Sequence, residues 1–97
     1  MRFVGLSRST RPTKKWAASF SRDDGRVKTV HFGQRGASDY TQHRDRERRR
    51  RYIERHSRGG RENWRDPTTP GALARYLLWN KPTLQASLAD YRRRFRV

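Results

Sequence analysis

Residues 44 to 61 hold the densest positive charge of the chain. Nine of these eighteen residues are arginine, six of them between Arg44 and Arg51, and only three acids oppose them, which leaves a net charge of +6. Like charges at this density repel one another unless a polyanion or an acidic protein neutralises them. We expect a helix over about residues 44 to 56, and a helix so strongly charged must lie outside the core.

The same bias runs through the whole chain. Lysines and arginines number 25 against nine aspartates and glutamates, which gives a net charge of +16 and a pI near 11.7. Apolar residues make up only 31% of the 97 residues, and a chain of this length buries roughly two thirds of the surface that its unfolded form exposes. We therefore expect one small domain with a thin core.

Composition also excludes several classes of site and location. The chain has no cysteine, so it has no disulfide and no zinc site that needs thiolates. No apolar run approaches the ~18 residues of a membrane span, and the segment from Met1 to Leu6 is too short for the apolar part of a secretory signal. The sequence predicts a soluble, unexported protein with no membrane span.

Residues 1 to 13 are predicted to form an extended basic arm, and residues 14 to 97 a single small α+β domain. The arm has three arginines, several serines and threonines, and no acid, a composition typical of segments that do not fold alone. Phe3, Val4 and Leu6 could still dock it as an edge strand or on a neighbouring molecule.

A β-hairpin is predicted next. Two β-prone runs, Trp16 to Phe20 and Val27 to Phe32, flank a turn that contains Asp24 and Gly25. Asp-Gly between such runs is the strongest short-range signal for a hairpin, and the glycine supplies the positive φ that the turn requires.

Two further helices are predicted after the arginine-rich one. Thr69 followed by Pro70 is typical of an N-cap and a first turn, and opens a helix over about residues 70 to 79. The last helix, about residues 83 to 95, places on one face Leu84, Leu88, Tyr91 and Phe95. These two helices are expected to hold most of the core. The predicted fold class is α+β: a small N-terminal β-hairpin followed by three short helices, with an extended basic N-terminal arm.

Thirteen arginines are the candidates for binding a polyanion or an acidic partner, because a guanidinium forms paired hydrogen bonds with phosphate and stays charged at every relevant pH. One alternative is a solvated helix whose many arginines reflect codon usage. Another, for the arginines that end the last helix, is that they complement the helix dipole. The candidates are Arg44, Arg46, Arg48, Arg49, Arg50, Arg51, Arg55, Arg58, Arg61, Arg92, Arg93, Arg94 and Arg96.

Residues other than arginine give weaker indications of a functional site. Trp64 is the candidate aromatic contact, since it lies in a polar loop while the other aromatic residues fall at positions that the core needs. His31, His43 and His56 lack the spacing of metal ligands, and we expect structural or surface roles for them. The sequence contains no nucleophile elbow, glycine-rich phosphate loop or paired carboxylates. It predicts a non-enzymatic protein with no metal, no cofactor and no small-molecule substrate.

Several short motifs suggest a family. They are Gly36-Ala37-Ser38-Asp39-Tyr40-Thr41, Arg51-Tyr52-Ile53-Glu54-Arg55-His56, Glu62-Asn63-Trp64, and Leu77-Leu78-Trp79-Asn80-Lys81-Pro82-Thr83 with Ser87. On these motifs the chain resembles, over about residues 27 to 95, a family of short basic proteins of unassigned function encoded by nucleocytoplasmic large DNA viruses of algae and amoebae. The resemblance implies a viral source and supplies no activity.

In a large virus particle, such a protein has two plausible roles. As a minor capsid or cement component it would bind acidic capsid proteins, with residues 1 to 13 as a clamping arm. Packaged with the genome, it would neutralise double-stranded DNA without reading its sequence. Charge alone favours the DNA-associated role. The turn-rich C-terminal half, the arm that can dock and the viral resemblance favour the virion structural protein, in the capsid shell or interior and, before assembly, in the infected host cell; this is the role that we predict. DNA association is the alternative, and a host-directed regulatory protein is a further one. The sequence does not decide whether residues 1 to 13, the arginine-rich helix and the C-terminal arginines form one basic surface or three.

Overall fold

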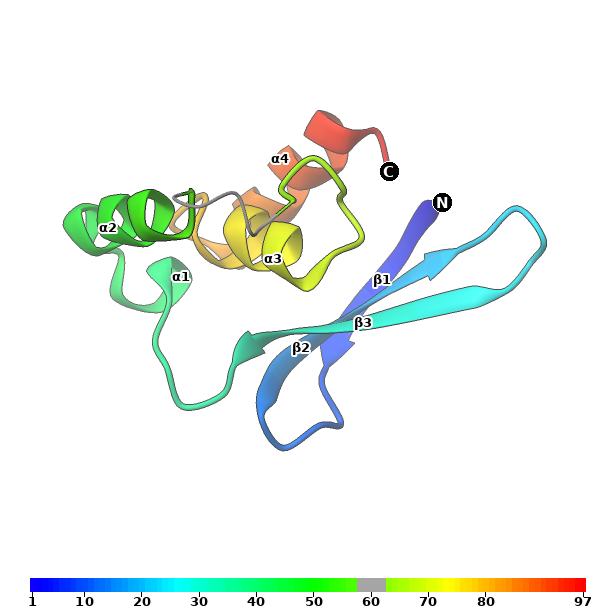
Figure 1. Cartoon of the computed structure of the whole chain (residues 1–97), viewed down its shortest axis with the longest axis horizontal. Helices are drawn as coiled ribbons and strands as arrows, with labels where there is room; N and C mark the ends of the chain where they lie inside the picture. Colours follow the sequence, from blue (N-terminus) through cyan, green and yellow to red (C-terminus); the bar gives the residue numbers. More distant parts are fainter. Residues whose placement is uncertain (58–62) are drawn as a thin grey trace.

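A computed structural model of the chain describes residues 1–57 and 63–97, in which an N-terminal sheet is followed by helices. The sheet is antiparallel, with strand order β1-β2-β3, and consists of β1 (Arg2–Arg8), β2 (Lys14–Ser21) and β3 (Val27–Gln34). The helical elements are α1 (Tyr40–His43), α2 (Arg46–Ser57), α3 (Pro70–Leu73), the π-helical turn η2 (Ala74–Leu78) and α4 (Leu84–Phe95). The helices gather on one side of the sheet (Figure 1). The predicted α+β class is confirmed.

The predicted hairpin is formed by β2 and β3. Its turn is closed by a hydrogen bond of 2.7 Å from the Arg22 N–H to the Arg26 carbonyl, and Gly25 has a φ of 86°. Each strand is longer than predicted, because pairing continues outward to Lys14 and Gln34. This extension brings the start of β2 beside the end of β3.

The predicted extended arm is corrected by the structure, in which residues 2–8 form the edge strand β1. The sheet therefore has three strands instead of the two of a hairpin. β1 pairs with β2 from Arg2 to Arg8, with a bulge at Val4. Phe3 is buried and meets the rings of Phe20 and Tyr91 edge-on, at centroid distances of 5.8 and 6.0 Å. Burial of one aromatic side chain contributes about 1.5–3 kcal/mol, which explains why this basic segment joins the sheet.

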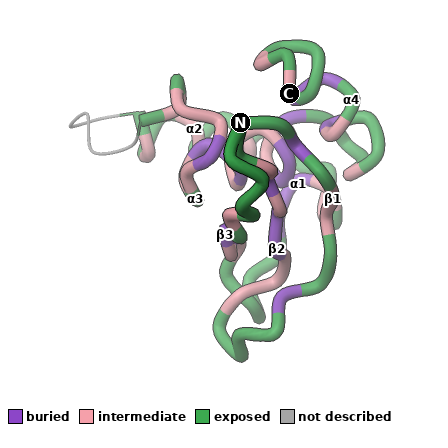
Figure 2. The backbone as a smooth tube through the Cα atoms, turned by 90° about the vertical axis from the view of Figure 1, so that its right-hand side faces the viewer, coloured by how far each residue is buried: buried purple, intermediate pink, exposed green. Residues whose placement is uncertain are grey.

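The core lies between the sheet and the helices, and the sheet contributes more to it than the sequence predicts. Alternate residues of the strands face the helices, as the buried segments in Figure 2 indicate. Of the predicted stripe on the last helix, Tyr91 is fully buried, whereas Leu84, Leu88 and Phe95 are only partly buried. The buried apolar cluster consists of Phe3, Ala18, Phe20, Val30, Phe32, Leu73, Leu77, Leu78 and Tyr91.

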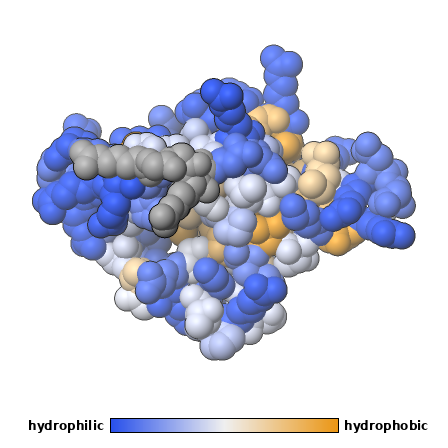
Figure 3. All heavy atoms as spheres, in the orientation of Figure 1, coloured by the Kyte–Doolittle hydropathy of each residue, from blue (hydrophilic) through white to orange (hydrophobic). Residues whose placement is uncertain are grey.

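The helices agree in part with the three that the sequence predicts. The predicted helix over 44 to 56 is α2, the one over 70 to 79 is α3 continued by η2, and the last is α4. The short helix α1 was not predicted; Asp39 caps it by accepting a hydrogen bond from the Thr41 N–H. As predicted, α2 has no buried residue, and the atoms over it in Figure 3 are hydrophilic. No helix in the described residues is both long and apolar enough to cross a membrane.

The turn between η2 and α4 is held by buried polar groups. The Asn80 amide donates to the Asp90 carboxylate at 2.7 Å, and Ser87 Oγ accepts from the Lys81 N–H at 3.0 Å. The hydrogen bond from Asn80 is the main reason why the pKa of Asp90 is lowered, against the opposing effect of burial. Because Asn80 and Asp90 are both nearly inaccessible to solvent, this contact fixes the backbone of the turn.

Candidate anion-binding groove

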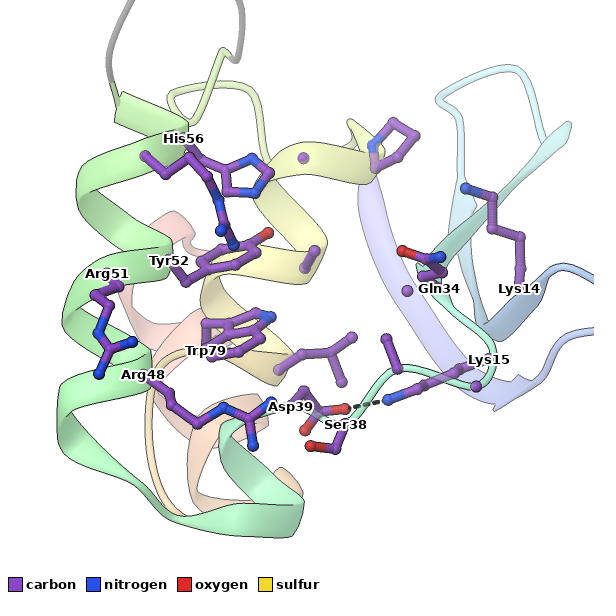
Figure 4. A pocket seen from close by; sticks show the side chains of 18 residues that line it. Lys14, Lys15, Gln34, Ser38, Asp39, Arg48, Arg51, Tyr52, His56 and Trp79 are labelled. Carbon is purple, nitrogen blue, oxygen red and sulfur yellow. Dashed lines mark hydrogen bonds and ion pairs between the residues drawn. The ribbon is translucent and has the colours of Figure 1, made fainter.

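A groove of about 740 Å³ lies between α2 and the adjoining ends of β2 and β3. One wall carries Lys14 and Lys15 from β2, and the other carries three arginines of α2, namely Arg48, Arg51 and Arg55. Residues three and four apart share one face of a helix, which is why these three arginines line the same wall. In Figure 4, Arg48 extends from α2 below the ring of Trp79, and Lys14 lies on the opposite side.

Asp39 is the only acid among the described residues that line the groove. Its carboxylate pairs with Lys15 Nζ at 2.7 Å and also caps α1. Lys15 donates in addition to the Gln42 side chain at 2.8 Å. Five cations against one carboxylate give the lining a net charge of +4 with His56 neutral. Among the described residues, no carboxylate forms an ion pair with Lys14, Arg48 or Arg55.

A stack of aromatic rings joins α2 to the rest of the molecule. Tyr52 lies parallel to Trp79 at a centroid distance of 4.2 Å and an angle of 3°, and His56 stacks on Tyr52 at 4.1 Å. Figure 4 shows the three rings in the order His56, Tyr52, Trp79, so both faces of Tyr52 are covered. All three residues line the groove. Tyr52 therefore has no open face on which a nucleic-acid base could stack.

The other arginines of α2 and its entry turn have different roles. Arg49 Nε donates to the Asn80 carbonyl at 2.9 Å, and Arg44 Nε to the Pro82 carbonyl at 3.2 Å. Both therefore attach α2 to the turn before α4. Arg50 pairs with Glu47 at 2.6 Å and Glu54 at 2.9 Å.

The pairing with Arg50 lowers the pKa of Glu47. Arg51 lies 3.5 Å from the same carboxylate, so it is the least available of the three groove arginines. Arg46 is exposed and lies on the side of α2 away from the groove.

The C-terminal arginines are separate from the groove. Arg93 and Arg94 pair with Asp90 at 3.0 and 3.2 Å. Arg92 donates to the Val97 carbonyl, and its guanidinium lies 5.6 Å from the centre of the Phe3 ring. Arg96 caps α4 in the left-handed conformation, with a φ of 56°. Of these contacts, only the one between Arg92 and Phe3 joins the end of α4 to the sheet; the others lie within α4 and its C-terminal end.

Three candidate residues of the predicted site remain. Trp64, the candidate aromatic contact, is half-buried, and the guanidinium of Arg75 lies 5.6 Å from its ring centre. This cation–π contact gives Trp64 a role within the fold. Arg58 and Arg61 lie outside the described residues.

The histidines all contact other side chains. His31 Nδ1 lies 2.7 Å from Ser9 Oγ, and His56 belongs to the ring stack. His43 Nδ1 accepts a hydrogen bond from the Asp45 N–H at 2.9 Å, and its ring packs on Trp79. Burial and the nearby Arg48 lower the pKa of His43, because each disfavours a second proton on the ring.

The lowered pKa of His43 predicts a loss of stability in mild acid. The unfolded chain takes up a proton near pH 6.5, whereas the folded chain does so only at lower pH. The stability that the folded chain gains by keeping His43 neutral is therefore complete above pH 6.5. It is lost as the pH falls from there to the pKa of His43 in the folded chain. Urea unfolding between pH 5 and 8 measures it. His43→Gln, which keeps an acceptor for the Asp45 N–H, should flatten the curve; an unchanged pH dependence in this variant would exclude His43 as the cause.

The sequence does not predict the contribution of Lys14 and Lys15 to the site. They belong to a strand whose pairing places them opposite α2, far along the sequence from the arginines. The i, i+3, i+7 spacing of Arg48, Arg51 and Arg55 was the available signal for a shared wall. Only the tertiary arrangement shows what lies opposite that wall.

One family model matches the chain, over residues 4–56. The matched segment contains both basic walls of the groove, while the turn that carries Trp79 lies beyond it. No curated protein and no solved structure matches the chain. The match covers more than half of the 97 residues, and the chain therefore belongs to the family of unknown function DUF5754.

Proposed function

We propose that this chain is a non-enzymatic protein that binds the phosphate backbone of nucleic acid in the groove between α2 and β2. The observation that carries the proposal is the convergence of five cations, from two segments far apart in sequence, on one groove. In the part of the chain that the structure describes, the one carboxylate of this groove, that of Asp39, is already engaged. Such a site attracts a polyanion because binding relieves the repulsion between the two walls.

Phosphate suits this site better than isolated carboxylates do. Arg48 and Arg55 offer guanidinium groups that bind phosphate oxygens in pairs, and Lys14 adds a point charge from the other wall. Contacts to phosphate position a protein on nucleic acid without specifying sequence. We therefore expect binding that is independent of sequence and steeply dependent on salt.

Neutralising the groove should weaken binding to DNA. In Arg48→Gln with Arg55→Gln, two phosphate contacts are lost. The affinity should fall by roughly 10- to 100-fold at 0.1 M salt, and the slope of log affinity against log salt should become shallower by about 1.5 to 2. Fluorescence anisotropy with a mixed-sequence oligonucleotide of about 16 nucleotides, in single-stranded and duplex form, measures both quantities.

The matched control is Arg22→Gln with Arg46→Gln, which removes the same charge from exposed positions outside the groove. Its affinity should stay within about threefold of the parent protein. Polyglutamate tests the chemistry of the partner and should bind more weakly than DNA. The proposal fails if neither form of DNA binds, or if the groove variant and the control lose equal affinity for both forms.

A virion structural role is the second candidate, as a minor capsid component that binds acidic capsid proteins. It is favoured by the position of the C-terminal arginines: Figure 1 places the end of α4 beside the N-terminus and away from α2. Arg92 and Arg93 are exposed there. A protein with two separated basic surfaces can join packaged DNA to an acidic shell. Residues 2–8 would not act as a clamping arm in this role, since they form β1.

Fractionation of virus particles would separate these roles. Retention on shells emptied of DNA supports the structural role. Retention on the released genome, reversed by salt, supports nucleic-acid binding. A chain that is missing from purified particles would favour a host-directed regulatory protein.

A further inference from the structure

We propose that the groove takes a single strand of nucleic acid, with phosphates on its two basic walls and bases against its apolar floor. This inference rests on the proposed function and names the form of nucleic acid that the groove would bind. It comes from the distribution of residue types within the groove.

The floor of the groove is apolar. It is formed by Pro70, Gly71 and Ala74 of α3 and η2, with Trp79 beside them; Leu78 also lines it but is only 2% exposed. Leu78 can approach β3 closely because Gly33 has a φ of 81° and no side chain; a Cβ there would lie 2.8 Å from Leu78 Cδ1. A phosphate over the apolar side chains of this floor would lose hydration, whereas the flat face of a base would bury apolar surface on them.

The walls complement the floor. Lys14 lies on one side of the groove and Arg48 on the other (Figure 4). Arg55, which also lines the groove from α2, adds a second guanidinium along the path that we expect for the backbone of a strand. Basic grooves that follow the backbone, with apolar or aromatic surface for the bases, are the usual means of binding single strands. Tyr52 and Trp79 cover each other's faces, so the bases would meet ring edges and aliphatic groups. Contacts of this kind do not discriminate between bases.

A duplex fits this groove poorly. The groove volume of about 740 Å³ is in the range of sites that enclose ligands of drug size. A duplex is a stiff rod with its bases paired inside and its phosphates outside. It could touch the rims of the two walls, but it could not place bases on the floor.

The test compares three oligonucleotides of equal phosphate number by fluorescence anisotropy: a mixed-sequence single strand, its duplex, and an abasic single strand. We expect the abasic strand to bind roughly 5- to 100-fold more weakly than the normal strand, and the duplex to bind more weakly than the single strand. The loss of affinity caused by Arg48→Gln with Arg55→Gln should be larger for the single strand than for the duplex.

Pro70→Glu adds a second criterion, because it introduces a carboxylate at the floor. Pro70 is exposed in the first turn of α3, where an acid is compatible with a helix. Gln85→Glu is the control: it adds the same charge in the first turn of α4, outside the groove. We expect Pro70→Glu to weaken single-strand binding by roughly tenfold and Gln85→Glu to leave it within about twofold. Thermal melting checks that both variants fold.

The outcomes separate this inference from the proposed function. Equal affinity for the abasic and the normal strand, or equal effects of Pro70→Glu and Gln85→Glu, would overturn the single-strand inference and leave phosphate binding in place. The single-strand inference would also be overturned if Arg48→Gln with Arg55→Gln weakened duplex binding at least as much as single-strand binding. Failure of every DNA form to bind would overturn the proposed function itself.

Discussion

Phe20→Ala is expected to destabilise the protein by about 3–5 kcal/mol. The side chain of Phe20 is completely buried in β2, where it meets Phe3 edge-on and belongs to the cluster that joins the sheet to the helices. Its removal loses the burial of a large ring and leaves a cavity that the thin core cannot fill. Since small domains are stable by only about 5–15 kcal/mol, much of the folded population should be lost at 37 °C.

Urea unfolding followed by circular dichroism measures this loss. Val27→Ala is the control, because Val27 belongs to the same sheet but is 62% exposed. We expect it to change the free energy of unfolding by less than about 0.5 kcal/mol. Similar midpoints for the two variants would show that the core does not lie on this face of the sheet.

Asp90→Ala has the second largest expected effect, a destabilisation of about 3 kcal/mol. The carboxylate accepts hydrogen bonds from Asn80, Arg93 and Arg94. Its loss leaves the buried amide of Asn80 with one acceptor fewer, the Tyr76 carbonyl alone. The pKa of Asp90 is near 3.8 in the unfolded chain and lower in the folded chain. The stabilisation that the ionised carboxylate provides is therefore complete above about pH 4, and it is lost as the pH falls through the pKa of Asp90 in the folded chain.

Asp90→Ala should also weaken binding in the groove, because the turn that it loosens contains Asn80, and Arg49 attaches α2 to the carbonyl of Asn80.

Asp90→Asn is the control for the loss of stability, since it keeps an oxygen acceptor and removes only the charge. We expect it to lose less than half as much stability as Asp90→Ala. Equal losses would mean that the charge, and not the hydrogen bond to Asn80, stabilises the turn. Differential scanning calorimetry at pH 7 and pH 3 provides the comparison.

Local signals predicted most of the secondary structure. Asp24-Gly25 located the hairpin, Thr69-Pro70 located the start of α3, and the spacing of Leu84, Leu88 and Tyr91 located α4. Each of these signals acts within a few residues, so the sequence alone contains it. The sequence left open whether residues 1 to 13 form an arm or an edge strand, because the burial of Phe3 depends on Tyr91 near the other end of the chain.

For the candidate site, the sequence located the charge but not its neighbours. Charge density identified α2, but only the structure shows which of its arginines are engaged: Arg49 by a carbonyl and Arg50 by two glutamates. The glutamates at i−3 and i+4 from Arg50 were a usable local signal for that pairing. The second wall of the groove was not predicted, since Lys14 and Lys15 meet α2 only through tertiary packing.

The way α2 is attached has a consequence for motion. This helix buries no residue and is held by the ring stack and by the bonds of Arg44 and Arg49. Because α2 has no buried residue, we expect it to open at a lower free energy than the sheet and α4, whose buried side chains form the core. The spacing between the two basic walls should then vary more readily than the packing of the core.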